Sequence, residues 1–514
     1  MTGKEQLMKK TYLLGTEALV SVVILFLVSV RLESVPPLWW DEGWTLSVAR
    51  NWIETGRYQR LLAGHLVPHG LEASPTLTGS IYIAFQLFGV GAFQARMVGV
   101  LYTLASLVVI YYLARRLYDR KIALSTLLIL TFTPAYIELI PVYFGRQVLG
   151  EMPAMFFLFV GYASFLLLLR RHILWISIPI LFWSVALCTK AQVLPFWLCS
   201  MIFPLGVLFY KKAWRSSLRF VFACAGSLIG SQLLFVLWRH FLWPDAANGA
   251  VTGLYEVTAA VTSIPARMFA LIVLVLFGLP TLVGLCHALW SMLARKSSFE
   301  NPVEYVRLSL LILAGSWFAW FVVLSVGWIR YISAATFIGS IFVAAMMHDF
   351  TRGFDVSYTI QRSLGFFRSG GFNKQAIGAL FVATVILTSV PRTAMALYKT
   401  YVLDADTSVQ QAAEFVNSHT RAEALIETYD SELFFLLNRP YHYPPDQIHV
   451  ELIRRTFLYD DNVIIDYDPL AANPDYLVVG PHSKQWRLYD SVLKTGQFRL
   501  IRVYKRYNVY ERVR

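Results

Sequence analysis

Long apolar stretches alternate with short polar segments along most of the chain. A helix of about 17 to 25 apolar residues is long enough to cross the hydrocarbon core of a bilayer. By this criterion the sequence predicts eleven membrane spans, at residues 12–32, 93–113, 122–138, 151–169, 172–188, 193–210, 217–240, 267–291, 306–327, 330–347 and 376–391. The pattern therefore indicates a polytopic α-helical membrane protein.

The apolar run from Thr76 to Val90 is too short to be a membrane span, since it has only about 15 residues. If it crossed the membrane, the basic loops that follow would face outward, against the usual enrichment of Lys and Arg in cytoplasmic loops. We therefore expect an interfacial or re-entrant helix here. The first outer loop then extends over about residues 33–92.

The apolar spans end near residue 400, and the residues after them have the mixed periodicity of a small α/β unit. The sequence predicts helices at 408–417, 431–437 and 486–494, and strands at 424–428, 476–479 and within 498–509. We expect two parts, a transmembrane domain (1–400) and a soluble α/β domain (401–514). The second part contains no P-loop, dinucleotide-binding motif or internal repeat, which disfavours an ATPase motor or a repeat array.

Composition and charge agree with a membrane protein and suggest its orientation. Hydrophobic residues make up 57% of the chain, charged residues only 15%, and the mean hydropathy is +0.53. The net charge of +13 is concentrated in alternate loops, which should be cytoplasmic. We therefore expect a plasma (inner) membrane protein with a retained signal anchor, a cytoplasmic N-terminus and an extracytoplasmic α/β domain. This distribution gives no reason to expect nucleic-acid binding.

Cysteine and histidine form no metal-binding pattern. The four cysteines, Cys188, Cys199, Cys224 and Cys286, lie within or at the ends of predicted spans. His65 and His69 are four residues apart, but Pro68 argues against the helix that would align them. We expect no cofactor and no disulfide in the outer part. A divalent metal is compatible with the sequence but not indicated by it.

The segment Trp39-Trp40-Asp41-Glu42 follows the first span directly. Carboxylates at a membrane surface are costly and usually functional, and we expect the two tryptophans to anchor the loop at the interface. The predicted topology places further polar residues at the same outer ends of the spans, namely Arg96, Glu138, Arg146, Glu151, Lys190, Arg330 and Tyr331. We expect this set to form one site.

Glycosyl transfer from a lipid-linked sugar phosphate requires such a set of groups. The acceptor hydroxyl loses a proton as it attacks the anomeric carbon, so a carboxylate is wanted as general base. The transition state is oxocarbenium-like, and the departing phosphate is best held by Arg or Lys. One carboxylate opposite a cationic cradle at the bilayer surface meets both demands, with the polyprenyl tail left in lipid.

The residues themselves resemble a family. The phrases WWDEGWTLSVARNWIETGRY, SPTLTGSIYIAFQLFGVGAFQARMVGVLY, FGRQVLGEMPAMFFLFVGY, ALCTKAQVLPF and GWIRYISAATF are similar, in this order, to the GT-C membrane glycosyltransferases. The similarity is to their protein mannosyltransferase and aminoarabinose transferase group (glycosyltransferase family 39-like) and covers about residues 12–350. Ser74 stands where aminoarabinose transferases carry Lys before Pro75, which disfavours that substrate. No loop between the spans is long enough for a lumenal trefoil-like domain.

The resemblance implies roles for single residues. Asp41, followed by Glu42, would be the catalytic base, with Glu151 as a second acidic residue. Donor-phosphate or structural positions would be Arg96, Lys190, Arg330 and Tyr331, and we assign Arg146 to the same set from its place in the second outer loop. The expected activity is that of an inverting hexosyl- or pentosyltransferase. It would move a sugar from a polyprenyl-phosphate donor to a hydroxyl of a glycan, lipid or protein acceptor at the outer face of the membrane.

Each assignment has a structural alternative. Asp41 and Glu42 could be solvated charges or could cap a helix over Trp44–Ile53. Glu151 could simply complement the dipole of its helix, and the basic residues could extend to headgroups or pair with carboxylates. Glu138 could be a buried ion-pair partner. For the whole protein, the alternative functions are a transporter or flippase of lipid-linked glycans, or a non-catalytic membrane assembly protein.

Overall fold

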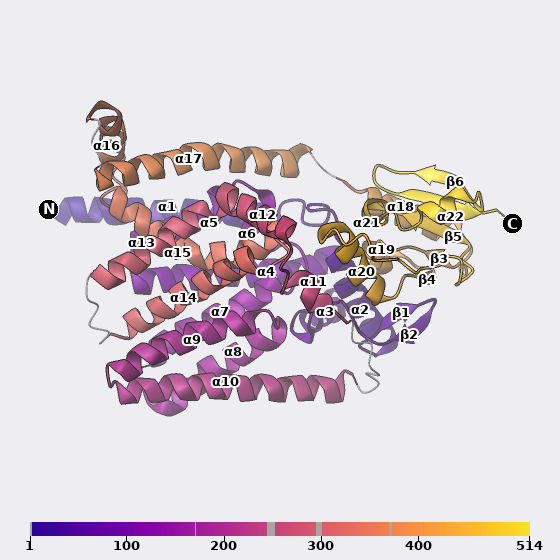
Figure 1. Ribbon diagram of the computed structural model, residues 1–514, viewed down its shortest axis with the longest axis horizontal. Helices are drawn as coiled ribbons and strands as arrows, with labels where there is room; N and C mark the ends of the chain where they lie inside the picture. Colours follow the sequence, from indigo (N-terminus) through magenta and orange to yellow (C-terminus); the bar gives the residue numbers. More distant parts are fainter. Residues whose placement is uncertain are drawn as a thin grey trace.

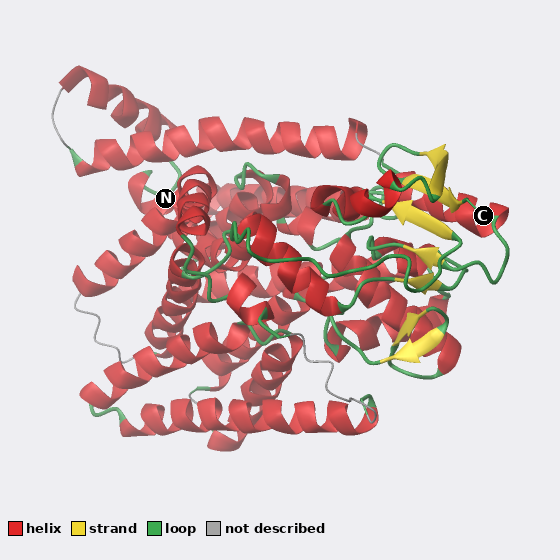
Figure 2. Ribbon diagram, turned by 45° about the vertical axis from the view of Figure 1, so that its right-hand side comes forward, coloured by secondary structure: helices red, strands yellow, loops and turns green. Residues whose placement is uncertain are grey.

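The computed structural model describes residues 3–169, 171–243, 252–294, 301–369, 373–403 and 406–513. Helices form a bundle, and the strands gather at one end of the molecule (Figure 2). The N-terminus lies at the opposite end of the bundle from the C-terminal strands (Figure 1). We refer to residues 406–513 as the α/β region, and to the end of the bundle that faces it as the α/β end.

Twelve of the described α-helices overlap the eleven predicted spans, two of them within one span. They are α1 (Gly3–Ser29), α4 (Ala92–Leu117), α5 (Arg120–Phe132), α7 (Glu151–Leu168), α8 (Ser177–Thr189), α9 (Val193–Tyr210), α10 (Trp214–Phe241), the pair α12 (Ile264–Val273) and α13 (Leu279–Ala294) joined by a π-helical turn, α14 (Pro302–Val323), α15 (Ser333–Phe350) and α17 (Lys374–Tyr398). Among the described residues, eight segments are long and apolar enough to cross a membrane, and two more apolar helices are shorter. The prediction of a polytopic helical membrane protein is confirmed.

The third predicted span, 122–138, is too long. Helix α5 ends at Phe132, because Pro134 has no backbone N–H to continue the helix and Ala135 has a φ of 58°. The chain continues as two short turns, η1 (Ile137–Leu139) and α6 (Pro141–Phe144). Glu138 therefore lies in a connection at the α/β end and not in a transmembrane helix.

The first long loop contains two helices and a hairpin. Helix α2 (Trp40–Thr55) leads to strands β1 (Arg60–Leu62) and β2 (His65–Val67), and α3 (Pro75–Phe88) follows. Since a helix rises about 1.5 Å per residue, the 14 residues of α3 span about 21 Å, too short for the hydrocarbon core. Its Tyr82 ring stacks on Trp52 of α2 at 4.2 Å, at the α/β end (Figure 1). This agrees with the prediction of a helix that does not cross.

The α/β region is built on a five-stranded sheet of order β4-β3-β5-β7-β6. The strands are β3 (Ile426–Glu427), β4 (Tyr441–His442), β5 (Tyr476–Val479), β6 (Phe498–Val503) and β7 (Asn508–Arg512). The three strands β4, β3 and β5 are parallel, and β7 and β6 continue the sheet in antiparallel fashion. The helices are α18 (Ser408–His419), α19 (Glu432–Leu436), α20 (Asp446–Phe457), α21 (Pro481–Trp486) and α22 (Asp490–Lys494). The expected α/β class is confirmed.

Two details of this region differ from the sequence prediction. The single helix expected over 486–494 is wrong, because Arg487 has a φ of 52°, a left-handed conformation that ends α21 before α22 begins. Helix α20 and the two-residue strand β4 were not predicted. Strand β4 is too short to show an alternating pattern.

The first loop and the α/β region share one hydrophobic core. Trp44 of α2 packs edge-on against Phe434 and Tyr443 at ring distances of 4.9 and 5.0 Å. Arg60 of β1 forms a bidentate ion pair with Asp446, with both N–O distances 2.9 Å. The residues around Asp41 are thus held between the membrane helices and the sheet.

Candidate active site

Helix α2 fixes Asp41 in its first turn. The chain enters this helix at Trp39, whose backbone N–H donates to the Glu42 carboxylate at 3.2 Å, a capping arrangement that defines where the helix begins. Residues adjacent on a helix point in different directions. As a result, the neighbouring carboxylates of Asp41 and Glu42 have different surroundings.

Asp41 forms an ion pair with Arg330, with 2.5 Å between Oδ2 and a guanidinium nitrogen. Arg330 belongs to η4 (Ile329–Ile332), the turn that leads into α15. Its guanidinium carbon lies 4.5 Å from the ring centre of Trp39 and 5.5 Å from that of Tyr331. The Asp41 side chain remains 31% exposed and that of Arg330 16%. The cation is therefore held by aromatic faces, while the carboxylate stays accessible.

A cavity of about 360 Å³ opens beside this pair, between the α/β end of the bundle and the α/β region. Its lining combines aromatic rings with a few polar groups, as in many ligand sites. The lining residues are Trp39, Trp40, Asp41, Tyr136, Glu138, Phe269, Trp328, Ile329, Arg330, Tyr429, His449, Phe457, His482, Gln485 and Trp486. A second cavity of about 280 Å³ shares Trp39, Glu138 and Arg330 with the first. Arg330 thus borders two adjoining spaces.

Glu138 also faces both cavities. Burial raises the pKa of its carboxyl, and the positive charge of Arg330 partly opposes that increase. The site therefore contains two carboxylates near one cation, in environments of different polarity.

Glu42 and Arg96 form a second ion pair, and it is fully buried. Arg96 of α4 binds both carboxylate oxygens of Glu42 at 3.1 and 2.9 Å, and both side chains have 0% exposure. The backbone N–H of Val148 also donates to Glu42, and Arg96 donates to the carbonyls of Leu32 and Pro36. The structure places this pair inside the protein, joining the first loop to α4, and not on the cavity wall.

Arg146 is likewise enclosed. Its guanidinium donates to the carbonyls of Leu27 and Val30, at the end of α1, and lies 4.9 Å from the ring centre of Tyr401. No atom of Arg146 is exposed. Among the described contacts it therefore connects α1 to the segment that follows α17.

Glu151 and Lys190 form a third ion pair, between the first residue of α7 and the residue that ends α8. Both side chains are partly exposed, and Glu151 lies close enough to Arg330 for their charges to interact. Tyr331 packs its ring against Trp328 at 5.4 Å. The structure therefore brings Asp41, Arg330, Tyr331, Glu151 and Lys190 together at the α/β end.

The cavity wall formed by the α/β region was not predicted. Trp40 was expected to anchor the loop in the membrane interface, and this is wrong, because its ring is 6% exposed and stacks on His449 at 4.5 Å. Its indole N–H donates to the carbonyl of Tyr429 at 3.1 Å. Burial lowers the pKa of His449 to about 4, so this wall residue is neutral at pH 7. The amphipathic pattern of α20 was the available signal, since it carries His449 on the side that packs against α2.

The two histidines of the first loop are not aligned on a helix. His65 lies in strand β2, and His69, after Pro68, stacks on Trp243 at 4.3 Å. This agrees with the interpretation of Pro68 as a helix breaker.

The arrangement of the helices and the α/β region is the GT-C fold of membrane glycosyltransferases. A family model for dolichyl-phosphate-mannose-protein mannosyltransferases matches residues 74–240. No curated protein sequence matches the chain significantly. The resemblance read from the sequence is confirmed.

Solved structures agree with this class. ArnT from Cupriavidus metallidurans, bound to undecaprenyl phosphate, superposes with a TM-score of 0.64 at 16% identity, over 97% of this chain and 98% of that one. Its apo form gives 0.61 at 17% identity, over 98% of both chains. The archaeal oligosaccharyltransferase AglB from Archaeoglobus fulgidus, in complex with an inhibitory peptide and a dolichol-phosphate, gives 0.55 at 12% identity, over 94% of this chain and 71% of that one. At these identities the likeness is one of fold.

Proposed function

We propose that this protein is an inverting glycosyltransferase that moves a sugar from a polyprenyl-phosphate donor to a hydroxyl of a glycan, lipid or protein acceptor. The observation that carries the proposal is the accessible Asp41 carboxylate, held against Arg330 beside a cavity at the α/β end of the membrane helices. The undecaprenyl phosphate bound to ArnT and the dolichol-phosphate bound to AglB support a donor of this class. The proposed location is the outer face of the plasma membrane.

In this mechanism Asp41 is the general base. It accepts the proton of the acceptor hydroxyl as the hydroxyl oxygen forms a bond with the anomeric carbon. The bond from that carbon to the phosphate oxygen breaks on the opposite face, so the configuration inverts. The electron pair leaves with the polyprenyl phosphate, which needs no proton from the protein.

Arg330 is the proposed phosphate ligand. It already borders both cavities, and its guanidinium can bind two phosphate oxygens at once. A donor phosphate would replace Asp41 as its partner, which frees the carboxylate for the acceptor. Lys190, which is paired with Glu151 near Arg330, is a second cationic group for the donor. Glu42, Arg96 and Arg146 then act as positioning residues for the loop.

The test is transfer in proteoliposomes from a panel of polyprenyl-phosphate sugars, with the wild type compared with Asp41→Asn. Loss of a general base lowers rates by about 10² to 10⁴, so we expect at least a hundredfold decrease at unchanged thermal stability. Glu54→Gln is the matched control, because Glu54 lies on the same helix, exposed and paired with Arg50. It should retain the wild-type rate.

Two outcomes would contradict the proposal. Full transfer by Asp41→Asn would remove Asp41 from the chemistry. Movement of lipid-linked sugar across the bilayer, with no donor consumed, would identify a flippase.

A further inference from the structure

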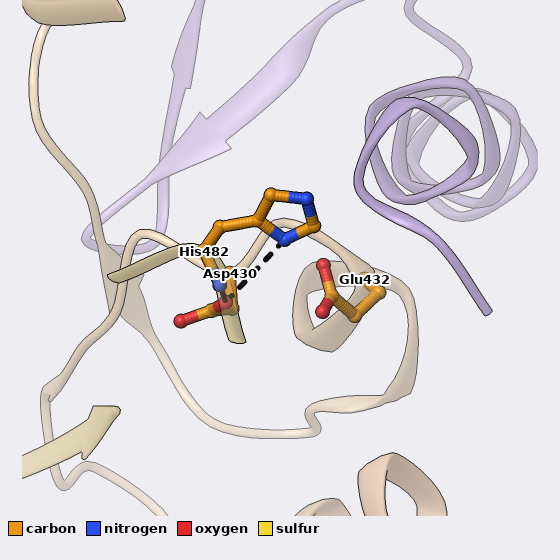
Figure 3. A group of neighbouring side chains, drawn as sticks. All are labelled: Asp430, Glu432 and His482. Atoms are coloured by element: carbon orange, nitrogen blue, oxygen red, sulfur yellow. Dashed lines mark hydrogen bonds and ion pairs between the residues drawn. The ribbon is translucent and has the colours of Figure 1, made fainter. Parts of the chain in front are cut away.

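Three potential metal ligands meet where the α/β region touches α2. Asp430 follows strand β3, Glu432 is the first residue of α19, and His482 lies in α21. One ligand atom from each lies within 4.8 Å of the other two. The three side chains point toward a common space (Figure 3).

Asp430 is rigidly held by its own hydrogen bonds. Its Oδ2 accepts from the backbone N–H of Gly480 at 2.8 Å and from the hydroxyl of Ser483, and its Oδ1 accepts from the N–H of His482 at 2.7 Å. These bonds fix the carboxylate at the start of α21. An ion bound here would meet a ligand that is already oriented.

Glu432 and His482 each have a buried polar atom without a hydrogen-bond partner among the described residues. Glu432 is 1% exposed; its Oε1 accepts from the Tyr507 hydroxyl at 2.5 Å, but Oε2 has no hydrogen-bond partner among the described residues. Nδ1 of His482 lies 3.6 Å from Oδ1 of Asp430, close enough for an ion pair when the imidazole is protonated but too far for a hydrogen bond. A buried carboxylate oxygen and a buried imidazole nitrogen without hydrogen-bond partners are costly unless something binds them.

The negative charges of the cluster also favour a bound cation. The ligand atoms of the two buried carboxylates, Asp430 and Glu432, lie within 4.8 Å of each other, and close negative charges inside a protein are costly unless a cation balances them. The ammonium of Lys484 is directed elsewhere, to the carbonyl of Arg506 at 2.7 Å. A divalent cation would balance both carboxylates.

We propose that Asp430, Glu432 and His482 bind one divalent transition-metal ion. A nitrogen ligand with two carboxylates favours Zn²⁺ or Mn²⁺ over Mg²⁺, and Zn²⁺ binds most tightly of these on general grounds. His482 is 21% exposed and lines the cavity beside Asp41, which leaves an open coordination position on that side. The site is separate from the proposed base and phosphate ligands.

The ion would also fix the wall next to Asp41. The hydroxyl of Ser431, between two of the ligands, donates to the carbonyl of Trp40, and Trp40 donates to Tyr429. Binding at Asp430 and Glu432 therefore immobilises the segment that contacts the residue before Asp41. The metal would connect the order of the α/β region to the geometry of the active site.

The experiment uses the full-length, tag-free protein, stripped with chelator and titrated with Zn²⁺, Mn²⁺ and Mg²⁺ by calorimetry, with bound metal counted by mass spectrometry. We expect one ion per chain, and a Kd that increases in the order Zn²⁺, Mn²⁺, Mg²⁺. Glu432→Gln and His482→Gln should each raise the Kd for Zn²⁺ at least about tenfold. Glu427→Gln is the matched control, because Glu427 is equally buried beside His442 but hydrogen-bonded by Tyr467 and Tyr489.

A second measurement, the visible absorption of bound Co²⁺, needs only the wild-type protein. It therefore tests the proposal even if a variant fails to fold. A Co²⁺ complex with one imidazole and carboxylate oxygens should give visible absorption bands that saturate at one equivalent and disappear on addition of Zn²⁺. Wild-type protein that shows no such bands, or folded variants that bind Zn²⁺ as tightly as the wild type, would overturn the proposal.

Discussion

Asp41 and Glu42 are adjacent in the chain, but the structure gives them opposite environments. Asp41 is 31% exposed and paired with Arg330 at the cavity, whereas Glu42 has 0% exposure and is paired with Arg96 in the interior. A carboxylate that must accept a proton from a substrate needs access to it. The residue pair therefore divides into one group suited to chemistry and one suited to holding the helix in place.

Replacing Glu42 should affect stability before chemistry. Glu42→Gln leaves Arg96 buried without its counter-charge, a loss of about 3–5 kcal/mol for a broken buried pair. We expect a clearly lower midpoint of thermal unfolding in detergent, while Asp41→Asn changes it little. A Glu42→Gln protein with a normal midpoint but no transfer activity would show instead that Glu42 takes part in the reaction.

At the scale of elements, helix α2 connects the site to the α/β region. Its Gly43 lies so close to the segment before α19 that an added Cβ would be 2.1 Å from the carbonyl oxygen of Ser431. Only a residue without a side chain permits this approach. The position of the cavity wall therefore depends on the absence of a side chain at Gly43.

Gly43→Ala should push the α/β region away from α2. We expect faster limited proteolysis of the α/β region and a loss of transfer of at least about tenfold, because a misplacement of about 1 Å can cost 10²-fold. Gly79→Ala is the control, since its Cβ would meet only the Trp52 ring at 3.9 Å, an ordinary contact. Equal protease resistance in the two variants would show that the contact at Gly43 is not a constraint.

Asp406 links the start of α18 to the turn between β6 and β7 in a pH-dependent way. Burial tends to raise the pKa of its carboxyl, but the hydrogen bond from Ser408 and the charge of Arg506, at 2.7 Å, hold it below its ordinary value. Its stabilising contribution is therefore fully present above pH about 4, the usual unfolded-state pKa of Asp, and is lost as the pH falls through the lowered folded-state value.

Asp406→Asn should therefore destabilise the protein at pH 7 by about 1–2 kcal/mol, and the difference from wild type should shrink below pH 4. Thermal unfolding over pH 3 to 8 measures both effects. Asp461→Asn, at an exposed position, should leave the curve unchanged. A difference that persists undiminished at pH 3 would exclude the carboxylate charge as its cause.

At the scale of the whole molecule, the sequence predicted the helices well and the site only in part. Each span is a local pattern of apolar residues, and strand β5 was predicted with its observed bounds for the same reason. The pairing of Asp41 with Arg330 and the contact of Trp40 with His449 join residues 289 and about 400 positions apart. Local periodicity contains no information on such contacts. For the same reason, the burial of Arg96 and Arg146 could not be distinguished from exposure at a membrane surface.

The orientation of the protein in the membrane stays a prediction. It can be tested by labelling engineered cysteines at the two ends of the helix bundle. In a background without native cysteines, we expect Gln497→Cys, an exposed position in the α/β region, to react with an impermeant maleimide in intact cells. Lys211→Cys, exposed at the end of α9, should react only after permeabilisation. The reverse labelling would place the α/β region in the cytoplasm and invert the proposed topology.

The hydrogen bond from Trp40 to Tyr429 also has a consequence in time. The two residues lie 389 positions apart in the chain. The ribosome therefore adds Tyr429 long after Trp40 has left the ribosome. Because chains are made from the N-terminus at about 5–20 residues per second, the segment that holds Asp41 waits through most of synthesis without the partners that shape it. A nascent chain thus inserts its helices first and gains a complete cavity last. A truncated product lacking its final portion would occupy the membrane without a finished site in which to bind a sugar donor.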